Sequence, residues 1–244
     1  MLEGLYSAAA GMSAQQEQLN AISNDLANVS TTGYKAERVA FSDLLYNPVD
    51  VAGTETSVGA GASARMIGRS EAQGAIQETG EPLDLAIEGA GCFEVKRANG
   101  QLALTRDGSF GVDASGSIVN SEGSRLSPPI KLPKGVSASE VSIAPDGTVT
   151  AGARKLGQIK LVTVTSPEHL LSDAGGELTP TAQSGKPHPA TGKIHQGALE
   201  ASNVNIASEM ALMASTQRNY QLTSTAIQTE SQMMSIANQL RPGS

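Results

Sequence analysis

Apolar residues follow a seven-residue repeat at both ends of the chain, and the repeat predicts a long helix at each end. The N-terminal repeat consists of Leu5, Met12, Leu19 and Leu26, followed three residues later by Ala8, Gln15, Ile22 and Val29. This spacing is the a/d seam of a coiled coil, with Gln15 as its polar member. Asn and Thr residues from Asn28 to Thr32 compete for backbone hydrogen bonds, so we expect the helix to fray there and to stop at Gly33.

The C-terminal repeat has two apolar stripes. The first consists of Ile206, Met213, Tyr220, Ile227 and Met234, and the second of Leu212, Ala226, Met233 and Leu240, interrupted by Asn219. Ser202, Asn203 or Asn205 can cap the start of this helix. Two stripes on one helix predict apolar contacts on two sides.

Between the helices the pattern is that of β-strands. Asn99-Gly100 separates two alternating segments, which predicts a hairpin, and Asp-Gly turns recur at Asp107 and Asp146. We expect a compact, mostly antiparallel β domain over about 82–165, and extended or loop-like chain over 47–80 and 166–197. The prediction is an α+β fold with a helical coiled coil and four segments: an axial helix at 1–33, a connector at 34–81, the β domain at 82–197 and a second axial helix at 198–244.

Composition excludes several classes of protein. The net charge of −7 argues against nucleic-acid binding, which needs clustered Lys and Arg. Cys92 is the single cysteine, so no internal disulfide forms. The start of the chain lacks the Lys or Arg that precedes a cleaved secretory signal, so we do not expect one.

No group of residues predicts catalysis, a cofactor or a metal. His169, His188 and His195 lack metal-ligand spacing and are expected to be surface imidazoles. Cys92 is expected to be a small strand hydrophobe, and Asp107, Asp113 and Asp146 to form turns rather than a calcium loop. A rival interpretation as a polysaccharide hydrolase would need a convergent carboxylate pair, and the sequence does not single one out.

The outer positions of both predicted helices carry almost no charge. Gln, Asn, Ser and Thr stand where a solvated coiled coil carries Glu and Lys. Such side chains can be buried at modest cost when hydrogen-bonded. One face therefore suits the chain's own other end, and the rest suits neighbouring subunits. Two alternatives stay open: a two-helix stalk that completes a monomer, and a secreted adhesin or phage-tail-like β module on a helical stalk.

Three motifs, in order along the chain, resemble those of flagellar basal-body rod and hook proteins. They are "ISNDLANVSTTGYKAERVAFSDLL", "LDLAIEGAGCFEV" with "LTRDGSFGVDASGSIV", and "ALEASNVNIASEMALMASTQRNYQLTSTAIQT". The motif residues carried over are Asn24, Leu26, Asn28, Gly33, Tyr34, Phe41, Asn203 and Asn205.

The resemblance implies a structural subunit of the rod, without enzymatic activity or cofactor. It implies self-assembly through the terminal helices into a hollow helical shaft that transmits motor torque to the hook. The implied partners are further copies of the chain, neighbouring rod and hook proteins, and the flagellar export apparatus, which would move the chain across the inner membrane without a cleaved signal. The length favours a rod over a hook subunit. The motifs are closer to the distal rod, while the short connector leaves a proximal-rod role open.

Overall fold

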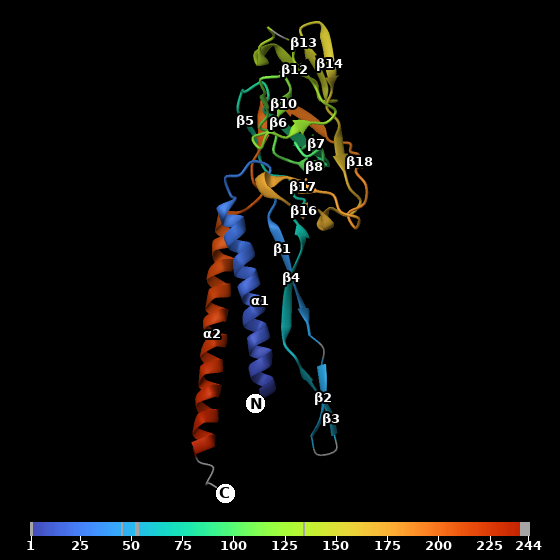
Figure 1. The fold of residues 1–244 in the computed structure, drawn as a ribbon. Coiled ribbons are helices and arrows are strands. Elements are labelled where there is room, and N and C mark those ends of the chain that lie inside the picture. The colour runs from blue at the N-terminus through green and yellow to red at the C-terminus, as the bar shows by residue number, and fades with distance from the viewer. Residues whose placement is uncertain (1, 45, 52–53, 134, 240–244) are drawn as a thin grey trace. The chain divides into compact units, whose positions relative to one another are not determined.

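The structure, a computed structural model, describes residues 2–44, 46–51, 54–133 and 135–239. The chain forms two compact units (Figure 1). Unit 1 consists of Met1–Leu26, Glu37–Ile67 and Asn205–Ser244, and unit 2 of Ala27–Ala36 and Gly68–Val204. The chain thus crosses between the units four times, and each unit is built from segments that are far apart in sequence.

Unit 1 contains the two long helices and a pair of β ribbons. Helix α1 covers Leu2–Ala27 and α2 covers Ile206–Gln239, which confirms the two helices expected from the repeats. Leu240, the last member of the second predicted stripe, lies outside the described residues. The strands are β1 (Glu37–Asp43), β2 (Tyr46–Val51), β3 (Thr54–Gly59) and β4 (Ala62–Arg69). Strand β1 pairs with β4, and β2 pairs with β3 from Tyr46↔Gly59 to Val51↔Thr54. The predicted connector is therefore extended chain.

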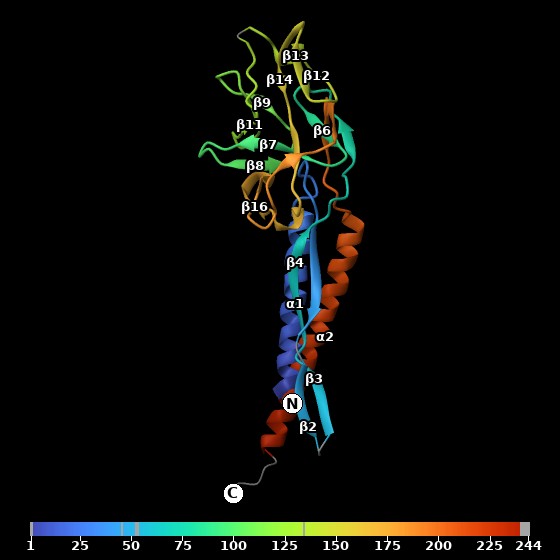
Figure 2. The ribbon, with the colours of Figure 1, turned by 90° about the vertical axis from the view of Figure 1, so that its right-hand side faces the viewer.

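Within unit 1, α1 lies between α2 and the β1–β4 ribbon (Figures 1 and 2). A Cβ added at Gly4 would lie 3.4 Å from the Glu230 carboxylate of α2. On the other side of α1, a Cβ added at Gly61 would lie 2.9 Å from the carbonyl oxygen of Ser7 and 3.1 Å from the Cβ of Ala10. Helix α1 therefore packs on two sides.

Unit 2 is built around strand β7 of a nine-stranded sheet. Strand β7 (Cys92–Lys96) pairs with β8 (Leu102–Thr105), which confirms the hairpin predicted at Asn99-Gly100. It also pairs with β11 and β15, and all pairs recorded in this sheet are antiparallel. The other strands of the sheet are β9 (Gly111–Val112), β10 (Ile118–Val119), β11 (Arg125–Leu126), β15 (Leu161–Thr163), β16 (Leu171–Ser172), β17 (Leu178–Thr179) and β18 (His188–Pro189).

Three smaller sheets complete unit 2. They are β12 (Val141–Ile143), β13 (Thr148–Ala151) and β14 (Arg154–Gln158); β6 (Leu85–Glu88) with β19 (Lys193–Gln196); and β5 (Ile76–Glu78) with β20 (Ala198–Glu200). Short 3-10 turns lie at Ala138–Glu140, Pro167–His169 and Ala174–Gly176. The predicted loop-like segment 166–197 thus contributes several short strands.

The core of unit 2 lies between these sheets. Alternate residues of β7 point into it, and Phe93 and Val95 are fully buried. Phe93 meets Phe110 edge to face, with ring centroids 5.2 Å apart, in the geometry that aromatic pairs prefer. Leu85 and Ile87 of β6 and Ile194 of β19 join the same cluster. The β unit therefore has a hydrophobic core of its own.

Candidate functional site

The N-terminal repeat forms one face at α1, which we call the inner stripe of α1. It consists of Leu5, Ala8, Met12, Gln15, Leu19, Ile22, Leu26 and Val29. Ile22 is fully buried and the other seven are partly buried. Val29 lies just beyond the end of α1, and the side-chain oxygen of Gln15 is buried without a hydrogen-bond partner. The regular heptad thus coincides with a face that is at least partly buried along its whole length.

A second face of α1 is turned towards the β1–β4 ribbon. Ala14, Ala21 and Asp25 are buried there. The carboxylate of Asp25 accepts a hydrogen bond of 3.0 Å from the backbone N–H of Glu37, and the Asn24 amide donates to the Glu37 carboxylate at 2.9 Å. The motif residue Asn24 therefore ties the end of α1 to the start of β1.

Along one face of α2, apolar residues alternate with polar ones. The apolar residues, which we call the inner stripe of α2, are Ile206, Met213, Tyr220, Ile227 and Met234, and all but Ile206 are partly buried. The positions four residues before or three after them are Glu209, Thr216, Thr223 and Glu230, and they are buried or partly buried too. The hydroxyls of Thr216 and Thr223 donate to carbonyl groups four residues earlier. This face of α2 is consequently much less apolar than a typical coiled-coil seam.

Polar groups fix the start of α2. The side chain of Asn205 accepts a hydrogen bond of 3.2 Å from the backbone N–H of Ser208, which is the geometry of an N-cap. Of the three candidates in the sequence, the cap is therefore Asn205. One turn later, burial and the nearby charge of Asp25 raise the pKa of Glu209.

Each helix also has an exposed stripe without charge. The outer stripe of α2 consists of Leu212, Ser215, Asn219, Leu222, Ala226, Thr229, Met233 and Ile236, all exposed. Leu222 is 64% exposed and Met233 is 56% exposed. The outer stripe of α1 consists of Tyr6, Ala9, Ser13, Gln16, Asn20 and Ser23, also all exposed. Both stripes have the alternating three- and four-residue spacing of a packing seam.

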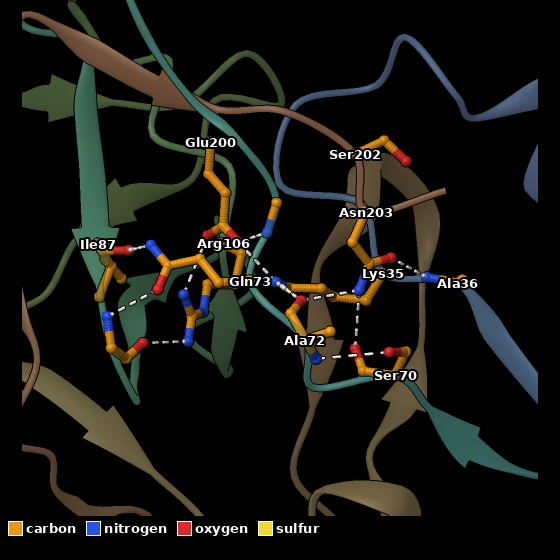
Figure 3. A network of polar contacts seen from close by, with 12 residues as sticks. Lys35, Ala36, Ser70, Ala72, Gln73, Ile87, Arg106, Glu200, Ser202 and Asn203 are labelled. Atoms are coloured by element: carbon orange, nitrogen blue, oxygen red, sulfur yellow. Dashed lines mark hydrogen bonds and ion pairs between the residues drawn. The ribbon is translucent and has the colours of Figure 1, made fainter. Parts of the chain in front are cut away.

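In unit 2, a buried carboxylate joins three distant segments (Figure 3). Glu200 of β20 is 1% exposed, and its carboxylate receives Lys35 Nζ at 2.6 Å, Arg106 at 3.0 Å and the backbone N–H of Gly74 at 2.8 Å. We call these contacts the Glu200 network. A buried carboxylate is costly unless it is paired and hydrogen-bonded, and here both conditions are met.

Asn203 adds hydrogen bonds to residues 35–36, the segment that contains Lys35, and to residues 70–72, which Lys35 also contacts. Its amide donates to the carbonyl groups of Ala72 and Ser70 at 2.8 and 3.2 Å, and its side-chain oxygen accepts from the N–H of Ala36 at 2.8 Å. The motif residue Asn203 therefore acts as a bridge between 35–36 and 70–72, not as the helix cap.

Gly33 fills a position that only glycine fits. Its φ is +67°, and a Cβ there would collide with the backbone of Arg106. Its N–H donates to the carbonyl group of Glu200 at 2.8 Å, and the N–H of Asn203 donates to the carbonyl group of Tyr34 at 3.3 Å. The chain that leaves α1 and the chain that approaches α2 thus run side by side in unit 2.

The remaining motif residues have local roles. Asn28 accepts a hydrogen bond from the Thr31 hydroxyl at 3.1 Å in the turn that follows α1. Tyr34 is partly buried, whereas Phe41 on β1 is 54% exposed.

The residues considered as candidates for catalysis or metal binding have structural roles. His169, His188 and His195 are exposed, as expected, and His195 pairs with Glu88 at 2.7 Å. Asp107, Asp113 and Asp146 each accept a backbone N–H two residues later, which confirms their prediction as turn formers. Cys92 begins β7, and burial raises the pKa of its thiol. In the described part of the chain, no cluster of three or more His, Cys, Asp or Glu residues is arranged to hold a metal ion, and no helix is long and apolar enough to span a membrane.

Three family models match successive parts of the chain. Residues 5–35 match a model described as flagella basal body rod protein, 86–151 the flagellar hook protein FlgE/F/G D1 domain, and 195–240 the flagellar basal body rod FlgEFG protein C-terminal region. Several relatives match over nearly the full length of the chain. The flagellar basal-body rod protein FlgG of Buchnera aphidicola subsp. Acyrthosiphon pisum is 35% identical, over 98% of this chain and 100% of the relative. The FlgG protein of Borreliella burgdorferi is 36% identical, over 99% of both.

A further similar protein comes from Bacillus subtilis. The FlgG protein of Bacillus subtilis is 32% identical, over 96% of this chain and 97% of the relative. With this fold and these relatives, the chain is a structural protein of the bacterial flagellum. It belongs to the flagellar basal-body rod protein family and is similar to the members named FlgG.

Membership in the family settles several expectations. The chain is a structural subunit of the rod and not an enzyme, and its place is the flagellar basal body, with other rod and hook proteins. The adhesin or phage-tail alternative is not supported, because rod proteins match along the whole chain.

Proposed function

We propose that copies of this chain polymerise through α1 and α2 into the helical shaft of the rod, which carries motor torque to the hook. Within one copy, the inner stripes of α1 and α2 pair as a coiled coil. The inner stripe of α1, which is at least partly buried along its length, supports this pairing, as do the partly buried Met213, Tyr220, Ile227 and Met234 of α2.

The weakness of the pairing supports polymerisation. Glu209, Thr216, Thr223 and Glu230 interrupt the apolar face of α2, so one pair of helices buries little apolar surface. Helices in proteins owe most of their stability to tertiary packing rather than to propensity. In this proposal, neighbouring copies provide the additional packing.

In this proposal the outer stripes carry the contacts between copies, and the observation that both stripes are exposed without charge is its main support. The outer stripe of α2 presents Leu222 and Met233 without a single charge, and that of α1 presents Tyr6 among small or uncharged polar side chains. Stripes with this three- and four-residue spacing form ridges that can pack into the grooves of a neighbouring helix. A contact between different faces of identical subunits, repeated with a rotation that does not close, produces a helical polymer.

The remaining expectations belong to the same proposal. In this proposal the segments 1–33 and 198–244 supply the axial helices, and the connector at 34–81 leads from the first of them to the β domain at 82–197. Other copies, neighbouring rod and hook proteins and the flagellar export apparatus are the partners, and export across the inner membrane takes place without a cleaved signal peptide. The family resemblance supports the export route.

Leu222→Asp tests the proposal, with Gln228→Asp as the matched control. Both changes place one carboxylate on an exposed position of α2, but only Leu222 lies on the outer stripe. We expect Leu222→Asp to abolish swimming and to leave no rods in purified basal bodies, because an unpaired charge would be buried between copies. Gln228→Asp should swim normally. Normal rods in the Leu222→Asp strain, with the variant incorporated, would exclude the outer stripe as a contact between copies.

A further inference from the structure

A cavity of about 270 Å³ lies in unit 2 beside the Glu200 network, and the rod function does not account for it. The side chains of Leu104, Val164 and Leu178 form part of an apolar wall. Lys35, Arg69 and Arg106 also line it, so three cations face a small apolar space.

The three cations differ in whether their charge is already paired. Lys35 and Arg106 both bind the carboxylate of Glu200. Arg69, at the end of β4, makes no hydrogen bond or ion pair among the described residues. Glu71 also lines the cavity, but it forms no ion pair with Arg69 in the described part of the chain. The guanidinium of Arg69 is therefore available to an anion.

The size and lining of the cavity define the chemistry that fits it. A volume of 270 Å³ is below that of most small-molecule pockets, so it suits a group of side-chain size. The apolar wall favours a short alkyl chain, and Arg69 favours a carboxylate, which a guanidinium can bind with two hydrogen bonds.

We infer that this cavity receives an acidic side chain, next to an apolar one, from a second copy of the chain. The inference rests on the proposed polymerisation, which surrounds each copy with others. Local charge complementarity supports this source, because Arg69 is an unpaired cation in the described part of the chain and unit 2 of a second copy presents exposed carboxylates at Glu78, Glu122 and Glu140. The contact joins two β units and is separate from the outer stripes of the helices.

Hexanoate is a probe for this chemistry in the free protein. Titrated into the 15N-labelled full-length chain, it should shift the amide signals of Gly89 and Gly91 in a saturable way, since both glycines line the cavity. Hexanol lacks the charge and acetate lacks the alkyl chain, so each should bind more weakly. Arg69→Gln should weaken hexanoate binding by about tenfold, as expected for a lost charge-assisted hydrogen bond.

Arg65→Gln is the matched control for Arg69→Gln. Arg65 lies on the same strand, is exposed and does not line the cavity, yet its replacement removes the same charge. This control should bind hexanoate as the unchanged chain does. Equal binding by Arg69→Gln and Arg65→Gln, or binding of hexanol as strong as that of hexanoate, would overturn the inference.

Photo-crosslinking in assembled rods tests the source of the carboxylate. A benzophenone side chain in place of Leu170 or Leu178, two further lining positions, should join the β unit to an acidic segment of a second copy. Rods that assemble but give no such crosslink from either position would overturn this inference and leave the proposed polymerisation intact. A purified chain that forms no polymer would instead contradict the proposed function, and the hexanoate titration would still test the cavity.

Discussion

At the scale of single residues, Glu200 shows what a sequence motif leaves undetermined. The motif that contains "EASNVN" marks the family, but it gives no indication of which residues Glu200 contacts. Its partners Arg106 and Lys35 are 94 and 165 positions away. Both lie within the other two motifs, but nothing in the motifs indicates that the three residues meet. Gly33 was expected to stop the first helix, but α1 ends at Ala27, and Gly33 instead approaches the backbone of Arg106 closely, which depends on the tertiary fold.

The buried carboxylate of Glu177 leads to a prediction about how the stability of unit 2 depends on pH. Glu177 is 2% exposed; its burial opposes ionisation, but hydrogen bonds from Ser124, Arg97 and Asn120 outweigh that effect and lower the pKa of Glu177. Because its pKa is lower in the folded than in the unfolded chain, Glu177 stabilises unit 2 fully above about pH 4.3, the usual value for Glu. The stabilisation is lost as the pH falls through the folded value.

Glu177→Gln should therefore lower the free energy of unfolding of unit 2 by about 2 kcal/mol at pH 7, and by progressively less below pH ~4.3. Urea unfolding of the full chain, followed through the NMR amide signals of β7 and β8, measures the difference. Glu78→Gln, at an exposed position, is the control and should change stability little at either pH. A deficit of the same size at pH 7 and pH 3 would show that the charge of Glu177 does not stabilise the fold.

At the scale of elements, periodicity predicted the helices better than it predicted their faces. The heptads located α1 and α2, and the Asn99-Gly100 turn located the β7–β8 hairpin. The stripe that begins at Leu212 has the same seven-residue period as the stripe that begins at Met213, about 100° away around the helix. Period alone cannot tell which stripe is buried in one copy. In the structure, Met213 and Tyr220 are partly buried while Leu212 and Met233 are exposed.

Ile227→Asp tests the role of the inner stripe of α2. Its carboxylate would lie on the face that the proposal pairs with α1, at a cost of about 3 kcal/mol or more if it is left unpaired. We expect loss of motility, together with an unchanged NMR spectrum for the amides of unit 2, because the β unit has its own core.

Gln221→Asp provides the comparison for Ile227→Asp. Gln221 is exposed on the same helix and lies outside both stripes, so this variant should swim normally. If Ile227→Asp also swims normally, the inner stripe does not hold the helices in the working rod.

At the scale of the whole molecule, the segments next to the helices belong to the β unit. Composition suggested only that 34–81 is a connector, since Gly, Ala and Ser give no sign of where a chain packs. The structure instead includes 27–36, 68–81 and 198–204 in unit 2. Hydrogen bonds among Gly33, Ala36, Ser70, Glu200 and Asn203 account for this, and they join segments whose closeness no local pattern encodes.

Limited proteolysis tests whether the helices of unit 1 are protected only when the chain is assembled into rods. In the free chain, we expect proteinase K, which does not require Lys or Arg, to remove α1 and α2 first, because under the proposed polymerisation these helices gain most of their burial from neighbouring copies. The protected C-terminal boundary should lie near Val204 rather than near Gly197, because Glu200 and Asn203 are anchored in unit 2. In assembled rods, the segment around Arg218 on α2 should resist cleavage under the same conditions. If mass spectrometry finds this segment equally protected in the free chain at low concentration, the helices are complete in a single copy and polymerisation is not what stabilises them.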